Sequence, residues 1–363
     1  MKSSSRPFIV DAHLDLSMNA MDWNRDFTQS IDHIRSRESS LTDKLDRGKG
    51  TVSFEELRKG NIGLCFATLI ARYVKPKNTL PGWFSPQQAW AHTQGQLAWY
   101  KQMEAEGHLT NITDLDHLEN HLSSWTTEEA DSAIGYILTL EGADSIVSLD
   151  HVHLMYEKGL RAIGPAHYGP GTYAFGTDSE GPIGKNGQAL LAEMEQCGIF
   201  LDVTHLSDMS FWETLESYHG PVWASHSNCR SIVPHQRQFS DEQLKELIQR
   251  KAVIGISFDA WMLVPKWERG VSDPYTFKVS LDHVVDHIDY ICQLTGNADH
   301  VGFGSDLDGG FGKDQCPHDL QTIADLQKLP SLLKGRGYSD SDIVKITSEN
   351  WIGFLRRNWA NES

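Results

Sequence analysis

Short apolar stretches recur along the chain, and each ends close to a polar residue. They are rich in β-branched and aromatic residues and read as nearly continuous hydrophobic runs rather than as strict alternation. Such runs are typical of parallel strands that are covered on both faces. Eight strands are predicted, over residues 8–13, 62–69, 134–142, 160–167, 198–205, 221–226, 252–259 and 300–306.

Helical patterns separate these runs. Residues 145–159 place apolar side chains at helical spacing and end at a glycine, and residues 188–198 follow the same scheme. A long helix is predicted around 85–106, and Ser240 begins a capping-box pattern. Eight strands with intervening helices predict a (β/α)₈ barrel. An open, doubly wound sheet is the alternative, but it usually carries a glycine-rich phosphate turn after its first strand, and this chain has none there.

We expect residues 1–363 to form a single barrel domain. Three connections are longer than simple loops, over about 16–52, 72–133 and 168–187, and the third is rich in glycine. Long loops that follow the strands of a barrel usually shape its pocket. We therefore expect these three loops to lie over an active site.

Polar residues able to do chemistry stand at the ends of the predicted strands. In a closed parallel barrel all of these ends meet on one face, so residues almost 300 positions apart would share one pocket. The residues are His13, Asp15, Glu141, His167, His205, His226 and Asp306.

Five of these residues suit a pair of divalent ions. Zn²⁺ and similar ions prefer imidazole nitrogen and carboxylate oxygen. Three histidines and two carboxylates are enough for two ions if one carboxylate bridges them. We expect Glu141, from the third predicted strand, to be this bridging ligand. Each residue alone is weak evidence, because a single histidine is more often structural, but five at matching strand ends favour a metal centre. They are His13, Asp15, Glu141, His205 and His226.

Asp306 is predicted to be the general base, since a carboxylate that binds no metal can accept a proton beside a metal site. Asp308 competes for this role, although it lies past the strand end and before two glycines. The chain has no GxSxG motif, no cysteine with an evident histidine partner and no P-loop. Nucleophilic catalysis by a side chain is therefore not indicated.

Five motifs occur together in this order: DAHLD, LTLEGAD, LDVTHLSD, ASHSNCR and GFGSDLDG. In this combination the chain resembles the membrane dipeptidase (renal dipeptidase) family, peptidase family M19, over about residues 8–359. The resemblance implies a (β/α)₈ barrel of the amidohydrolase-like type with two zinc ions. By this resemblance His13 and Asp15 bind the first ion, His205 and His226 bind the second, and Glu141 is shared.

The resemblance also implies roles in substrate binding and catalysis. His167 would polarise the scissile carbonyl, Asp306 would transfer the proton, and Arg237 would hold the terminal carboxylate of the substrate, with Arg230 as a rival. The implied reaction is hydrolysis of small dipeptides, including L-D dipeptides, by a hydroxide that bridges the metals. Two alternatives stay open: a dinuclear hydrolase of another amide, lactam or ester, and a metal-binding barrel without turnover.

Composition and charge limit the classes of partner that the protein is expected to bind. The net charge of −17 argues against binding to nucleic acid or to anionic membranes. The five cysteines are widely spaced without a CxxC motif, which is typical of reduced thiols rather than of a disulfide framework. With no signal peptide, membrane span or lipid anchor evident in the sequence, we expect a cytoplasmic enzyme for small substrates. Homodimerisation is left open.

Overall fold

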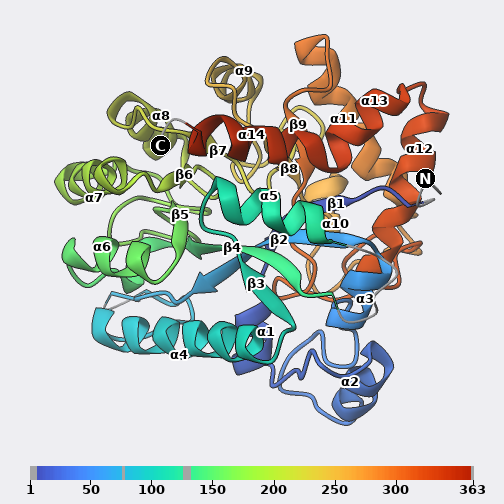
Figure 1. Ribbon diagram of the computed structural model, residues 1–363, viewed down its shortest axis with the longest axis horizontal. Coiled ribbons are helices and arrows are strands. Elements are labelled where there is room, and N and C mark those ends of the chain that lie inside the picture. Colours follow the sequence, from blue (N-terminus) through green and yellow to red (C-terminus); the bar gives the residue numbers. More distant parts are fainter. Residues whose placement is uncertain (1–5, 76–77, 126–131, 361–363) are drawn as a thin grey trace.

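The strands form one parallel sheet that closes into a barrel in the computed structural model, which describes residues 6–75, 78–125 and 132–360 (Figure 1). The barrel strands are β1 Ile9–Leu14, β2 Ile62–Ile70, β4 Ile134–Glu141, β5 Leu160–Gly164, β6 Phe200–Asp202, β7 Val222–Trp223, β8 Ile254–Ile256 and β9 Val301–Phe303. They are hydrogen-bonded in the order β7-β6-β5-β4-β2-β1-β9-β8. A parallel bridge between Ala224 and Ile254 joins the two ends of this order. The predicted fold class is confirmed, and all eight predicted strands are present.

One strand was not predicted. The short strand β3 (Leu109–Asn111) pairs with the beginning of β4, outside the barrel order. Three residues are too few to show a hydrophobic period, so the sequence offered no signal for it. It lies within the connection predicted over 72–133, of which residues 76–77 and 126–131 are outside the described residues.

The strands of the second half of the barrel are shorter than predicted. Strands β6 to β9 have two or three residues each, because the chain leaves the extended conformation before the polar residue is reached. His205 and Asp306 have φ angles of +70° and +59°, in the left-handed region that residues with side chains adopt at a cost. These residues therefore lie on tight turns beyond the strands.

Helices surround the sheet and follow the predicted pattern. Ser240 caps its helix in a capping box with Gln243, as expected. The stretch 145–159 forms a helix only from Asp150, after a 3₁₀ turn at Ala143–Ser145. The helices are α1 Leu16–Asp22, α2 Ile31–Glu38, α3 Phe54–Lys59, α4 Pro86–Ala105, α5 Leu115–Ser124, α6 Asp150–Glu157, α7 Gly184–Cys197, α8 Asp208–Ser217, α9 Asp241–Gln249, α10 Ala260–Leu263, α11 Leu281–Thr295, α12 Leu329–Gly335, α13 Asp340–Val344 and α14 Asn350–Trp359.

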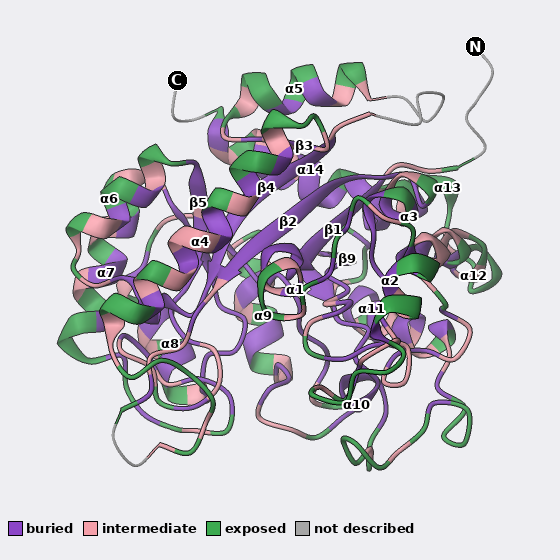
Figure 2. Ribbon diagram, turned by 90° about the horizontal axis from the view of Figure 1, so that it is seen from below, coloured by how far each residue is buried: buried purple, intermediate pink, exposed green. Residues whose placement is uncertain are grey.

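Two apolar layers hold the barrel. The larger lies between the strands and the outer helices, whose outward faces are exposed in Figure 2. The smaller fills the barrel interior, where Phe66 and Trp223 pack against Trp351 of α14. A Cβ at Gly302 would lie 2.3 Å from Nε1 of Trp351, so only glycine leaves room for this indole. Helices α5 and α14 thus cover one end of the barrel, and loops that follow the strands lie at the other (Figure 2). Because α5 belongs to the connection 72–133, that part of the connection does not lie over the site, contrary to expectation.

Candidate metal centre

Four side chains from the ends of three strands gather around one carboxylate. Glu141 is the last residue of β4, and its Oε1 lies 3.1 Å from Nε2 of His205, 3.4 Å from Nε2 of His226 and 3.8 Å from Nε2 of His13. Asp15 follows β1 directly, with Oδ2 3.9 Å from Nε2 of His13. Side chains separated by up to 213 positions therefore share one small volume around Glu141.

Neighbouring hydroxyl groups orient two of the imidazoles. Thr177 Oγ1 is hydrogen-bonded to Nδ1 of His205 at 2.8 Å, and Ser225 Oγ to Nδ1 of His226 at 2.9 Å. With Nδ1 engaged, both rings present Nε2 to the centre, where the two Nε2 atoms lie 3.1 Å apart. A hydrogen bond to the second ring nitrogen is the usual support of a metal-binding histidine.

The donor set fits divalent cations. Nε2 of His13 and Oδ1 of Asp15 are buried and have no hydrogen-bond partner among the described residues. Burial and the nearby Asp15 raise the pKa of Glu141 well above its usual range, and burial lowers the pKa of His13, His205 and His226. A divalent ion is bound by carboxylates and by neutral imidazoles. The buried carboxylates here have too little positive charge beside them, and a bound cation would supply it.

The structure groups the candidate ligands differently from the two predicted sets of three. Three groups have ligand atoms within 4.8 Å of one another: His13 with Glu141 and His226, Glu141 with His167 and His205, and His13 with Asp15 and Asp306. The rings of His13 and His226 also stack, with centroids 3.7 Å apart. Glu141 belongs to two of the groups, and its role as the shared ligand stays a prediction. The division of the other ligands between two ions stays a prediction.

His167 is set apart from the other histidines by an arginine that the sequence analysis did not single out. An NH2 group of Arg72, just beyond β2, lies 2.7 Å from Nδ1 of His167. Because a guanidinium only donates hydrogen bonds, Nδ1 must accept, and a neutral His167 carries its proton on Nε2. That nitrogen lies 3.9 Å from Oε2 of Glu141. His167 thus presents an N–H donor to the cavity, as a group that polarises a carbonyl requires, and not a metal-binding lone pair.

The two aspartates that competed for the role of base lie in different surroundings. Asp306 lines the cavity, with Oδ1 3.8 Å from Nε2 of His13, and burial together with Asp15 raises its pKa well above the usual range. The carboxylate of Asp308 accepts hydrogen bonds from the backbone N–H groups of Thr51 and Val52 and from the Thr51 hydroxyl. The geometry therefore favours Asp306 as the group that faces a substrate.

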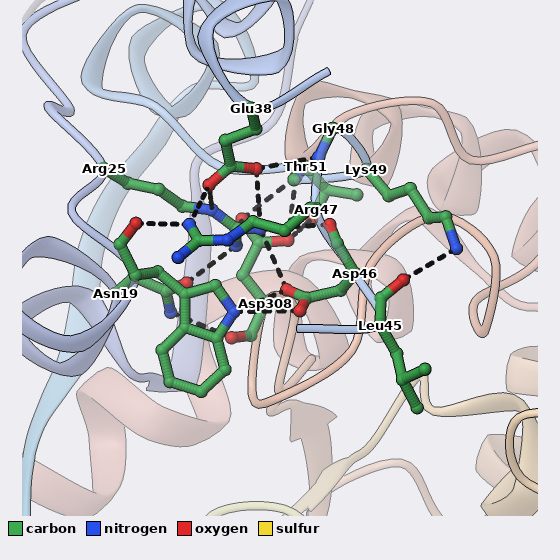
Figure 3. A network of polar contacts seen from close by, with 12 residues as sticks. Asn19, Arg25, Glu38, Leu45, Asp46, Arg47, Gly48, Lys49, Thr51 and Asp308 are labelled. Carbon is green, nitrogen blue, oxygen red and sulfur yellow. Dashed lines mark hydrogen bonds and ion pairs between the residues drawn. The ribbon is translucent and has the colours of Figure 1, made fainter. Parts of the chain in front are cut away.

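Asp308 belongs to a buried polar network around Arg25 (Figure 3). Arg25 donates to Glu38 at 2.9 Å and to Asp46 at 2.9 Å, and its NH1 lies 3.6 Å from Oδ2 of Asp308. Asn19 completes the network by donating to the carbonyl oxygens of Asp15 and Asp308. The network ties the loop after β1 to the loop after β9, next to two of the candidate site residues.

The two candidate arginines are also separated by their partners. Arg230 forms a bidentate ion pair with Asp208, with distances of 2.8 and 2.7 Å, and so stabilises a loop. Arg237 is buried and lines the cavity, where it donates to the hydroxyl of Ser227 and to the carbonyl of His226. No ion pair involves Arg237 within the described ranges, so its charge is available to an anionic group of a substrate.

A cavity of about 960 Å³ opens above the candidate centre. All three long loops contribute to its lining, with Trp23 and Lys44 from the first, Arg72 and Trp83 from the second and Tyr168 from the third. The sequence analysis missed Arg72, Asp259, Trp261 and Arg269, which also line it. Arg72 and Asp259 stand just after β2 and β8, so the rule of polar residues at strand ends could have found them. Nothing in the sequence pattern marked Arg269.

Comparisons with known proteins show which family and which solved structures the chain is similar to. The sequence profile of a family described as membrane dipeptidase (peptidase family M19) matches residues 4–362. Dipeptidase aclJ from Aspergillus oryzae is 27% identical over 369 residues, covering 96% of this chain and 77% of that protein. Within the described residues, no helix combines the length and the apolar character needed to cross a membrane.

Two solved structures share the fold at 23% sequence identity. One is the crystal structure of the dipeptidase AC, a metallopeptidase of family M19, with a TM-score of 0.78 over 98% of this chain and 99% of that chain. The other is a metallopeptidase from Rhodobacter sphaeroides bound to a phosphinate mimic of the dipeptide L-Ala-D-Ala, with a TM-score of 0.77 over 98% of this chain and 100% of that chain.

Proposed function

The chain belongs to the membrane dipeptidase family, peptidase family M19, and is a metallohydrolase; from this premise we propose that it hydrolyses the peptide bond of small dipeptides at a centre of two zinc ions. L-D dipeptides are included among the substrates. Glu141 would be shared by the two ions, and the other ligands would be His13, Asp15, His205 and His226.

The observation that carries this proposal is the convergence of three imidazoles on Glu141. The distances of 3.1, 3.4 and 3.8 Å from its Oε1 to the Nε2 atoms of His205, His226 and His13 bring nitrogen and oxygen donors into one buried volume. Mixed imidazole and carboxylate ligands suit zinc. The cavity above them leaves room for a small substrate, whereas a structural zinc site would be closed by four protein ligands.

We assign a separate role in hydrolysis to each side chain around this centre. Ions bound there would activate a water molecule and polarise the scissile carbonyl. Asp306 would accept the proton of that water and pass it to the departing amine. The Nε2–H of His167 would donate a hydrogen bond to the carbonyl oxygen as negative charge develops on it.

Arg237 would bind the C-terminal carboxylate of the substrate. Its guanidinium is buried and has no carboxylate partner among the described residues, so a substrate carboxylate would form a charge-assisted, bidentate contact. A pair of this kind, fixed at one distance from the scissile bond, would limit substrates to short peptides.

The test is a screen of the purified protein against L-L, L-D and Gly-D dipeptides before chelation, after chelation and after zinc is restored. We expect chelation to abolish hydrolysis, zinc to restore it, and metal analysis to find two zinc ions per chain. Turnover that resists chelation would contradict the metal mechanism. A protein that holds two ions but cleaves only another amide, a lactam or an ester would show that the dipeptide substrate is wrong.

A further inference from the structure

Arg269 extends across the mouth of the cavity. It belongs to the loop between α10 and α11, which follows β8, and its NH2 group donates a hydrogen bond of 2.6 Å to the hydroxyl of Tyr168, which follows β5. Its guanidinium carbon lies 4.0 Å from the centroid of the Trp261 ring. Arg269, Tyr168 and Trp261 all line the cavity. The guanidinium is therefore held in place at the rim by a hydrogen bond and a stacked ring.

Among the described residues, Arg269 has no carboxylate within ion-pair distance. Exposed arginines elsewhere, such as Arg336 and Arg356, lie within 2.7 Å of a carboxylate. Arg269 has no ion pair of 4.0 Å or less with any described residue, and its Nε and NH1 groups make no hydrogen bond within the same ranges. Asp259, an acid that also lines the cavity, accepts a hydrogen bond from Gln315 instead. A guanidinium with free donors therefore faces the space that a substrate would enter.

Arg269 lies on the same wall as Arg237. The Trp261 ring beneath Arg269 contacts the His235 ring, with centroids 5.0 Å apart, and Nδ1 of His235 accepts a hydrogen bond from the backbone N–H of Arg237. In the proposed binding mode, Arg237 pairs with a single carboxylate, the C-terminal carboxylate of the dipeptide. An aspartate or glutamate at the C-terminal position of a substrate carries a second carboxylate only a few bonds from the first, on the same side of the scissile bond.

This inference rests on the proposed dipeptidase function. We propose that Arg269 binds the side-chain carboxylate of an acidic C-terminal residue, so that preferred substrates are dipeptides ending in aspartate or glutamate. The preference would run against the net charge of −17, which repels anions from the molecule as a whole. A preference for acidic substrates must therefore come from a local contact. Substitution of one side chain can then test it.

The experiment compares kcat/KM of the zinc-loaded enzyme for alanylglutamate with that for alanylglutamine, in the L-L and L-D forms. The two substrates have nearly the same shape and differ in the charge of one group. We expect the acidic substrate to be favoured by about tenfold at low ionic strength, as for a charge-assisted contact at a partly exposed site. The preference should shrink as salt is added, because exposed charges are screened.

Variants of the same loop attribute the effect. Arg269→Met keeps an apolar side chain over Trp261 and should abolish the preference while hydrolysis of alanylglutamine persists. Arg269→Lys should retain part of it. Lys266→Met removes a charge from an exposed residue of this loop that does not line the cavity, and should leave the preference intact.

Two results would overturn the inference alone: equal kcat/KM for the two substrates in the wild type, or a preference that survives in Arg269→Met. If the zinc-loaded wild type hydrolysed neither substrate nor any other dipeptide, the proposed function would fail, and the inference with it.

Discussion

Two aspartates near the end of β9 are assigned different roles because their side chains have different neighbours. Asp306 and Asp308 are two positions apart, and both have positive φ angles. The hydrogen bonds that Asp308 accepts from Thr51 and Val52 make it an anchor, whereas Asp306 lines the cavity and lies 3.8 Å from His13. A buried carboxylate that is fully hydrogen-bonded stabilises the fold, and one that is left facing a cavity is available for chemistry.

Asp306→Asn tests the role of base. We expect the variant to bind metal as the wild type does and to lower kcat by about 100-fold or more, because an amide cannot accept the proton. Metal analysis and steady-state kinetics measure the two effects. Asp308→Asn is the comparison: it should lower Tm through weakened anchoring and change kcat only a few fold. The opposite pattern would assign the base to Asp308.

Arg72→Met tests the orientation of His167. Loss of the donor to Nδ1 lets the ring adopt the other tautomer, so we expect kcat to fall by about 10- to 100-fold with KM little changed. In a His167→Ala background the same substitution should cost nothing further, because Arg72 acts through that ring. Arg72→Lys, which keeps a donor, should recover part of the activity. Additive losses in the double variant would show that Arg72 acts independently of His167.

Elements far apart in the sequence are held in place by buried ionisable side chains. The loop after β1 carries α1 and α2, and it is held by Arg25, Glu38 and Asp46 (Figure 3). Helix α11 packs against the segment after β7, where Nδ1 of His287 accepts a hydrogen bond from the backbone N–H of Cys229. Each arrangement depends on the charge state of one side chain.

Arg25→Met would leave Glu38, Asp46 and Asp308 without their shared cation. Breaking a buried ion pair by removing one partner usually costs about 3–5 kcal/mol of stability. We expect a loss of that order in denaturant-induced unfolding. Arg37→Met, on the exposed side of α2, is the matched control and should change stability by no more than about 0.5 kcal/mol. Similar effects of both substitutions would show that the network contributes little.

His287 makes stability depend on pH. Burial lowers its pKa from 6.5 to about 4 in the folded protein, so between these values the unfolded chain binds more protons than the folded one. The contribution of His287 to stability is therefore complete at pH 7 and decreases as pH falls. From the shift, about 2 kcal/mol is lost between pH 7 and pH 5. Unfolding free energies at both pH values should differ by that much less in His287→Asn than in the wild type.

At the scale of the whole molecule, barrel closure makes the site. The bridge between Ala224 and Ile254 brings β7 and β8 together, and only then do the ends of β1, β4, β6 and β7 face one point. Helix α14 seals the opposite end with Trp351. One end of the barrel is thus closed by apolar packing that stabilises the fold, and the candidate site lies among the loops at the other end, as is usual for this architecture.

The sequence by itself determined the fold class and predicted which side chains gather around Glu141. Hydrophobic runs report burial on both faces, which is a local property of each strand, and the polar residue that ends each run is visible without knowing its neighbours. For that reason Glu141, His205 and His226 could be named from the chain alone. The short strand β3 could not, because three residues carry no period.

Only the tertiary structure decided which similar residues face the cavity. The hydrogen bonds that separate Asp306 from Asp308, the ion pair that separates Arg230 from Arg237, and the approach of Arg72 to His167 all join residues from different loops. Arg269 reaches Tyr168 across 101 positions. Sequence patterns record the period of one element, whereas contacts across the barrel mouth depend on how separate loops fold over it, and no local pattern encodes that.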